Sequence, residues 1–213
     1  MRSALPLLLA AAMLPTSAQD KPAASTPPAA PAAVSAEDLQ PEVKSYVLLV
    51  TAAIMEKTAE LFEQGAEGDV KRMLAEVTAA NTGVPTDKLP EAHRAYLAER
   101  HAVLHAIVQE VQAQENATDE SAKAVVDAHQ GEFKAIDAKY PEPAAALNEK
   151  LLNKTAHELM LKRNISARAV ADVMAHPDTT AKGQKATMIA YYRAAARLLR
   201  EAATEPGPGG TAQ

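Results

Sequence analysis

The chain is 213 residues long, and its 22 basic and 27 acidic residues leave a net charge of −5. This acidic balance argues against a nucleic acid partner, because binding to a phosphate backbone depends on clustered lysine and arginine. The sequence contains no cysteine, which excludes disulfide bonds, thiol catalysis and lipid attachment through a cysteine. The stability of the fold must therefore come from packing.

The N-terminus has the three parts of a cleavable signal peptide. Arg2 supplies a positive charge, residues 4–14 are apolar, and small residues precede a cleavage point near Ala18. The apolar part is shorter than the roughly 20 residues that a membrane-spanning helix needs. The next apolar run, residues 46–55, is shorter still and has charged residues on both sides. The sequence therefore predicts a signal peptide over residues 1–18, no membrane span, and a periplasmic or secreted protein.

Low-complexity segments border the predicted domain. Residues 19–34 consist almost entirely of proline, alanine, serine and threonine, which indicates a disordered linker. Residues 205–213 contain glycine and proline without an apolar anchor, which indicates a disordered tail. Residues 35–204 lie between these segments and have the length of one domain with one ordinary core.

Apolar residues in this domain recur at three- and four-residue intervals, and no stretch alternates as a strand would. The predicted fold class is therefore all-α, a single helical bundle-like domain of about six helices. Prolines, glycines and capping residues mark the helix ends. The predicted helices run over residues 41–64, 70–80, 90–115, 118–140, 143–176 and 179–203.

The first predicted helix, residues 41–64, is apolar on all sides, and we expect it to be central. One seam has the alternating four- and three-residue steps of knobs-into-holes packing. That seam consists of Val43, Val47, Val50, Ile54, Lys57 and Leu61. Leu48, Leu49 and Met55 make its other sides apolar, which predicts either a groove between alanine-lined helices or contact with a protein partner or a second copy.

The fifth predicted helix, residues 143–176, leaves one question open. Its apolar stripe comprises Leu152, Ala156, Leu159, Val170 and Met174. These residues share a face only if the helix continues through residues 164–166. A kink at that point is the alternative.

His101 and His105 form the sharpest local pattern for metal binding. An i, i+4 pair on a helix places both imidazoles on one face, within reach of a single divalent ion. A metal site needs at least a third ligand, and no carboxylate stands at the spacing of a known helical metal motif. Both histidines also lie at or beyond the border of the apolar face, so a surface pair is the alternative.

Two other histidines are candidates for a buried polar site. His129 shares a stripe with Val125, Phe133 and Ile136, so we expect partial burial and a hydrogen bond to a neighbouring carbonyl. The same position would suit a ligand, a base or a proton switch. His93 has the angular position of the apolar face of its helix and is expected to cover the edge of the core.

The last predicted helix carries a basic strip on an otherwise acidic chain. Its members are Lys182, Arg193, Arg197 and Arg200. Such a strip would receive an anionic ligand or an acidic partner. Positive charge near a helix C-terminus is also expected without a ligand, because it is stabilised by the helix dipole.

The sequence contains no motif for nucleophilic catalysis, for phosphate binding or for a dinucleotide cofactor. We therefore expect a non-enzymatic interaction or ligand-binding module of the bacterial cell envelope, without an organic cofactor. The alternative is a metal-binding helical bundle that uses His101 and His105. A hydrolase built on a carboxylate or on His129 is the third hypothesis.

Overall fold

The computed structural model describes residue 36, residues 38–176 and residues 182–205. The predicted signal peptide, the predicted linker and all but the first residue of the predicted tail lie outside the described residues. Within the described part of the chain, the secondary structure is all-α, with nine helices and no strand. None of the described helices is long and apolar enough to cross a membrane.

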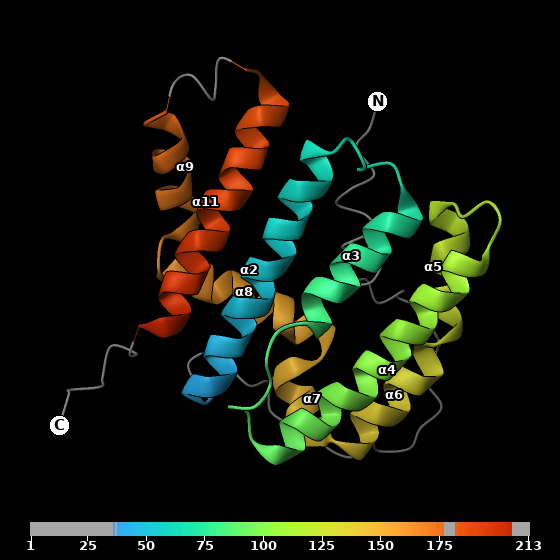
Figure 1. Cartoon of the computed structure of the whole chain (residues 1–213). Coiled ribbons are helices and arrows are strands. Elements are labelled where there is room, and N and C mark those ends of the chain that lie inside the picture. Colours follow the sequence, from blue (N-terminus) through green and yellow to red (C-terminus); the bar gives the residue numbers. More distant parts are fainter. Residues whose placement is uncertain (1–35, 37, 177–181, 206–213) are drawn as a thin grey trace, which may run out of the picture.

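In chain order the helices are α2 (Pro41–Glu63), α3 (Val70–Thr82), α4 (Glu91–Ala113), α5 (Asp119–Ala128), α6 (Gln130–Lys139), α7 (Pro141–Leu147), α8 (Glu149–Lys162), α9 (Ile165–Met174) and α11 (Gln184–Thr204) (Figure 1). The first three predicted helices are confirmed to within a few residues. The fourth predicted helix is two helices in the structure, and the fifth is three. The predicted cap of the last helix lies outside the described residues, and α11 begins after Gly183.

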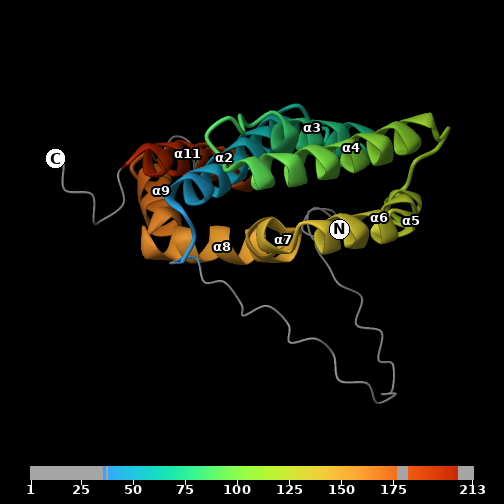
Figure 2. The same cartoon turned by 90° about the horizontal axis from the view of Figure 1, so that it is seen from below.

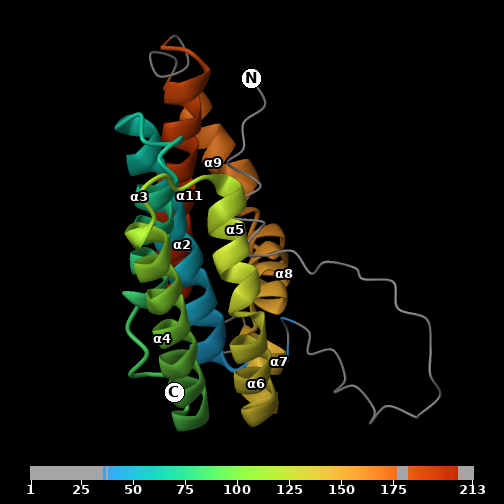
Figure 3. The same ribbon diagram turned by 90° about the vertical axis from the view of Figure 1, so that its right-hand side faces the viewer.

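The helices form two layers. One layer contains α11, α2, α3 and α4, which lie side by side in that order (Figures 1 and 2). The other layer is the continuous chain segment from α5 to α9, which runs along one side of the first layer (Figures 2 and 3). It contacts α4 through α5, α6 and α7, α2 through α8, and α11 through α9. The second layer therefore links the two edge helices of the first.

The central position predicted for the first helix is confirmed by the burial of α2. Val47, Val50 and Ala52 have no exposed surface, and α2 packs against α11, α3 and α8. Its main neighbour is α11, which contributes the fully buried Ala195 and Leu199. The two helices run antiparallel, and the small alanine side chains allow their backbones to approach closely.

A break at His129 separates α5 from α6, where the sequence predicts one helix over residues 118–140. The backbone at His129 has φ −86° and ψ 0°, and its N–H is shared between the carbonyls of Val125 and Val126. Gly131 follows in the first turn of α6, and glycine weakens helix propagation. The periodicity alone did not reveal this break, because the apolar residues remain in phase across it.

A second break, at Asn164, separates α8 from α9. Asn164 adopts the left-handed conformation, with φ 53° and ψ 32°, which rotates the following helix about its axis. The buried face of α9 is consequently Ile165, Ala169 and Val173. The predicted stripe is wrong beyond the break, because Val170 and Met174 are 51% and 65% exposed. The kink that the sequence left as an alternative is the observed structure.

The left-handed conformation at Asn164 can be tested by substitution. Asn164→Ala should lower the free energy of unfolding by about 1 kcal/mol, because a β-carbon without a compensating polar group disfavours this conformation. Asn164→Gly should be close to neutral, since glycine adopts positive φ readily. Urea denaturation monitored by circular dichroism measures both variants, and an alanine variant as stable as the wild type would contradict the assignment.

Candidate ligand-binding site

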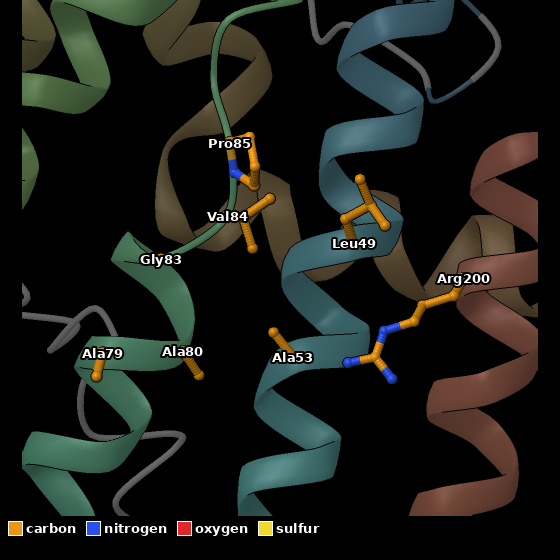
Figure 4. A pocket seen from close by; sticks show the side chains of 8 residues that line it. All are labelled: Leu49, Ala53, Ala79, Ala80, Gly83, Val84, Pro85 and Arg200. Carbon is orange, nitrogen blue, oxygen red and sulfur yellow. The ribbon is translucent and has the colours of Figure 1, made fainter.

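An open hollow lies on the first layer between α2 and α3, with α11 at its edge (Figure 4). It has a volume of about 320 Å³. Apart from one arginine, its lining consists of small apolar residues and a glycine. The lining residues are Leu49 and Ala53 from α2, Ala79 and Ala80 from α3, Gly83, Val84 and Pro85 from the segment after α3, and Arg200 from α11.

The local sequence explains why the hollow forms at this point. Gly83 ends α3, and its N–H donates to the carbonyl of Ala79 at 2.9 Å. A β-carbon at Gly83 would lie only 2.8 Å from that carbonyl oxygen, so the close turn requires glycine. Pro85 then keeps the chain extended, and it forms one wall opposite Leu49 (Figure 4). Alanines on the facing helices are too short to fill the space.

Arg200 supplies the one charged side chain that lines the hollow. Its guanidinium reaches from α11 toward α2 (Figure 4). There it donates hydrogen bonds to both carboxylate oxygens of Glu56. Hydrogen bonding to this carboxylate raises the pKa of Arg200, and the same bond lowers the pKa of Glu56. A guanidinium has five N–H donors, and this fork uses two of them. The corner of the hollow can therefore still donate hydrogen bonds to a ligand.

The other members of the predicted basic strip also have acidic partners. Arg193 donates to Glu63 on α2 at 2.6 Å. Arg197 lies on the side of α11 that faces α9, and it donates to Asp172 at 2.9 Å. Lys182 is exposed just before α11. The structure thus divides the strip between two sides of α11 and balances its arginines with carboxylates. Of its four members, Arg200 is the one that lines the hollow between α2 and α3.

His101 and His105 have different surroundings on α4. His105 is exposed, whereas His101 is partly buried and its Nε2 is buried without a hydrogen-bond partner. Burial, with smaller contributions from His105 and Arg100, lowers the pKa of His101 to about 4. Across the described residues, no group of three or more histidine, aspartate or glutamate side chains is placed to hold a metal ion. The metal site at His101 and His105 therefore stays a prediction, and the described residues supply no third ligand for it.

His93 and His129 also differ. His93 is 6% exposed, its Nδ1 has no hydrogen-bond partner, and burial lowers its pKa. The His129 side chain is 12% exposed, and its two ring nitrogens contact the carboxylates of Glu132 and Glu110. The sequence predicted a hydrogen bond between His129 and a neighbouring carbonyl. That prediction is wrong, because both ring nitrogens contact carboxylates. Neither histidine lines the hollow.

The chain has no significant similarity to a known protein family, to a characterised protein or to a solved structure. Its function must therefore be inferred from its own geometry. Sequence reasoning singled out Leu49 as an apolar surface residue of the first helix and Arg200 as part of the basic strip. It missed Glu56 and the segment from Gly83 to Pro85, although a glycine and a proline that end an alanine-rich helix were visible signals.

The burial of His101 predicts a specific dependence of stability on pH. The folded chain takes up a proton at His101 only near pH 4, whereas the unfolded chain does so near its ordinary pKa of 6.5. The contribution of His101 to stability is therefore present above pH 6.5 and is lost as the pH falls toward 4. As the pH is lowered from 6.5 to 4, the urea midpoint of unfolding should fall less steeply for His101→Gln than for the wild type. His157→Gln, at an exposed position on α8, is the control and should keep the wild-type slope.

Proposed function

We propose that this protein is a non-enzymatic ligand-binding module of a bacterial cell envelope, exported by its predicted signal peptide. Its ligand is a small molecule with an apolar body and one hydrogen-bond-accepting group. The observation that carries this proposal is the hollow between α2 and α3, with apolar walls and the guanidinium of Arg200 at one corner. The alternative is a protein partner or a second copy on the first helix; of the three residues predicted for it, Leu48 is buried, whereas Leu49 and Met55 are partly exposed.

The dimensions and the lining of the hollow suit such a ligand. Small-molecule sites in proteins have volumes of roughly 300–1,000 Å³ and combine apolar walls with a few polar groups that fix orientation. The hollow, at about 320 Å³, lies at the lower end of that range. Leu49, Ala80 and Val84 would cover an apolar body, and the unused N–H groups of Arg200 would donate to an acceptor at its end.

The same lining supports binding in preference to catalysis. Arg200 is the only titratable residue among the side chains that line the hollow, and its pKa is raised. An arginine that stays protonated cannot transfer protons at neutral pH. The hollow therefore provides shape and hydrogen-bond donors, without a general acid or base of matched pKa.

Filling the hollow tests the proposed site directly. Ala53→Trp places an indole between the walls and should reduce the affinity for the fluorescent apolar anion 1-anilinonaphthalene-8-sulfonate by about ten-fold or more. Ala98→Trp, at an exposed position on α4, is the matched control and should bind the probe like the wild type. Circular dichroism verifies that both variants are folded. Equal probe affinity in the two tryptophan variants would overturn the proposed site.

The ion pair at the edge of the hollow gives a second test, in which two substitutions should change the probe affinity in opposite directions. Arg200→Gln removes the guanidinium donors and should weaken probe binding by about three- to ten-fold, the effect expected for one hydrogen bond. Glu56→Gln keeps the guanidinium but removes the compensating negative charge, so the anionic probe should bind more tightly. Fluorescence titration measures both affinities. A shift of both variants in the same direction would refute the role assigned to Arg200.

A further inference from the structure

His129 occupies the joint between α5 and α6 and connects it to α4. Its Nδ1 lies 2.6 Å from Oε1 of Glu132, which is in the first turn of α6. Its Nε2 lies 2.8 Å from Oε1 of Glu110, which is near the end of α4. The imidazole thus bridges one carboxylate of its own turn and one of a different helix.

The bridge requires the charged form of the ring. A neutral imidazole carries one N–H, so it can donate to only one of the two carboxylates. At the other nitrogen, a lone pair would face a carboxylate oxygen at less than 3 Å. Both contacts are favourable only when both nitrogens carry a proton.

The charges around His129 favour that form. The carboxylate facing it from α4 is Glu110 and the one facing it from α6 is Glu132, and both raise its pKa, with the bond to Glu110 as the largest cause. Burial of the ring opposes this effect. On α5, the charged side chains of Lys123 and Asp127 pair with each other.

The bridge is important for α5 because little else holds that helix. Ala122 is its one fully buried residue, while Val125 and Val126 are only partly buried. The start of α5 is held by a capping box between Thr118 and Ser121. The end of α5 has the His129 bridge as its polar link to α4.

We propose that the Glu110–His129–Glu132 bridge is a pH-operated latch that fastens the α5–α6 joint to α4 when the imidazole is protonated and releases it when the proton is lost. On release the remaining N–H stays with Glu132, because that contact lies within one turn and needs less chain ordering than the contact to another helix. The contact with Glu110 opens, and α5 then opens away from α4 more often. Because the folded pKa is raised, the latch is fully closed below about pH 6.5 and opens as the pH rises through the folded pKa.

Amide hydrogen exchange of α5 in the full chain tests the latch. Wild type and His129→Gln are compared at the same pH, so that the intrinsic pH dependence of exchange cancels in their ratio. At pH 5.5 the α5 amides of the wild type should exchange about five-fold more slowly than those of the variant, the effect of about 1 kcal/mol for one ion pair. At pH 8.5 the difference between wild type and His129→Gln should be smaller than at pH 5.5, and His157→Gln should match the wild type at both values.

Two results would overturn the proposal. An exchange ratio between wild type and His129→Gln that is the same at pH 5.5 and pH 8.5 would show that His129 acts only by packing. The second readout is the titration of the His129 ring followed by NMR, in which Glu110→Gln should lower the pKa of the imidazole. A titration unchanged by that substitution would show that Glu110 has no part in the latch.

Discussion

The antiparallel pairing of α2 with α11 is the contact on which the rest of the structure depends. These helices come from opposite ends of the described chain, yet they are each other's main neighbours in the first layer. The pair can pack closely because α11 contributes small buried side chains, among them Ala195 and Ala196. Three of the described helices pack directly on this pair: α3 and α8 contact α2, and α9 contacts α11. The remaining helices are joined to it through α3 and α8.

The small side chains that allow close helix packing also explain the hollow. Alanine on α11 lets that helix come close to α2, but alanine on α3 meets the turn at Gly83 and leaves a space that no neighbouring side chain fills. A chain that relies on small residues for close packing is left with a cavity wherever its helices diverge. In this protein the hollow lies beside the ion pair of Arg200 and Glu56, so the space has one polar corner.

His101 and His129 have opposite effects on the structure as the pH falls. His101 resists protonation because its ring is buried, so acid destabilises the fold through it. His129 favours protonation because two carboxylates face it, so acid strengthens its contact with α4. Both act on α4, and the local tightening at its C-terminal end accompanies a global loss of stability.

The sequence was sufficient to predict the all-α class and the bounds of α2, α3 and α4, because prolines, glycines and caps mark those ends. It did not predict the break at His129, since an apolar pattern can continue in phase across a local change of backbone conformation. It left the kink at Asn164 as one of two alternatives, because periodicity alone does not decide between them. The candidate site was predicted only in part. Arg200 was recognisable as a cation, but its partner Glu56 and the facing alanines belong to other helices, and periodicity does not reveal which helices are neighbours.

One hydrogen bond at the end of the central pair has a consequence for folding kinetics. The hydroxyl of Ser45 donates to the carbonyl of Ala203 at 2.9 Å, so the start of α2 and the end of α11 touch across a sequence separation of 158 residues. The core therefore closes through its most distant contacts, which is the arrangement associated with slow folding. Because the two ends are adjacent, joining them with a short linker would turn this pairing into a local helical hairpin. Such a circularly permuted chain would keep the same core and would close it much earlier in folding.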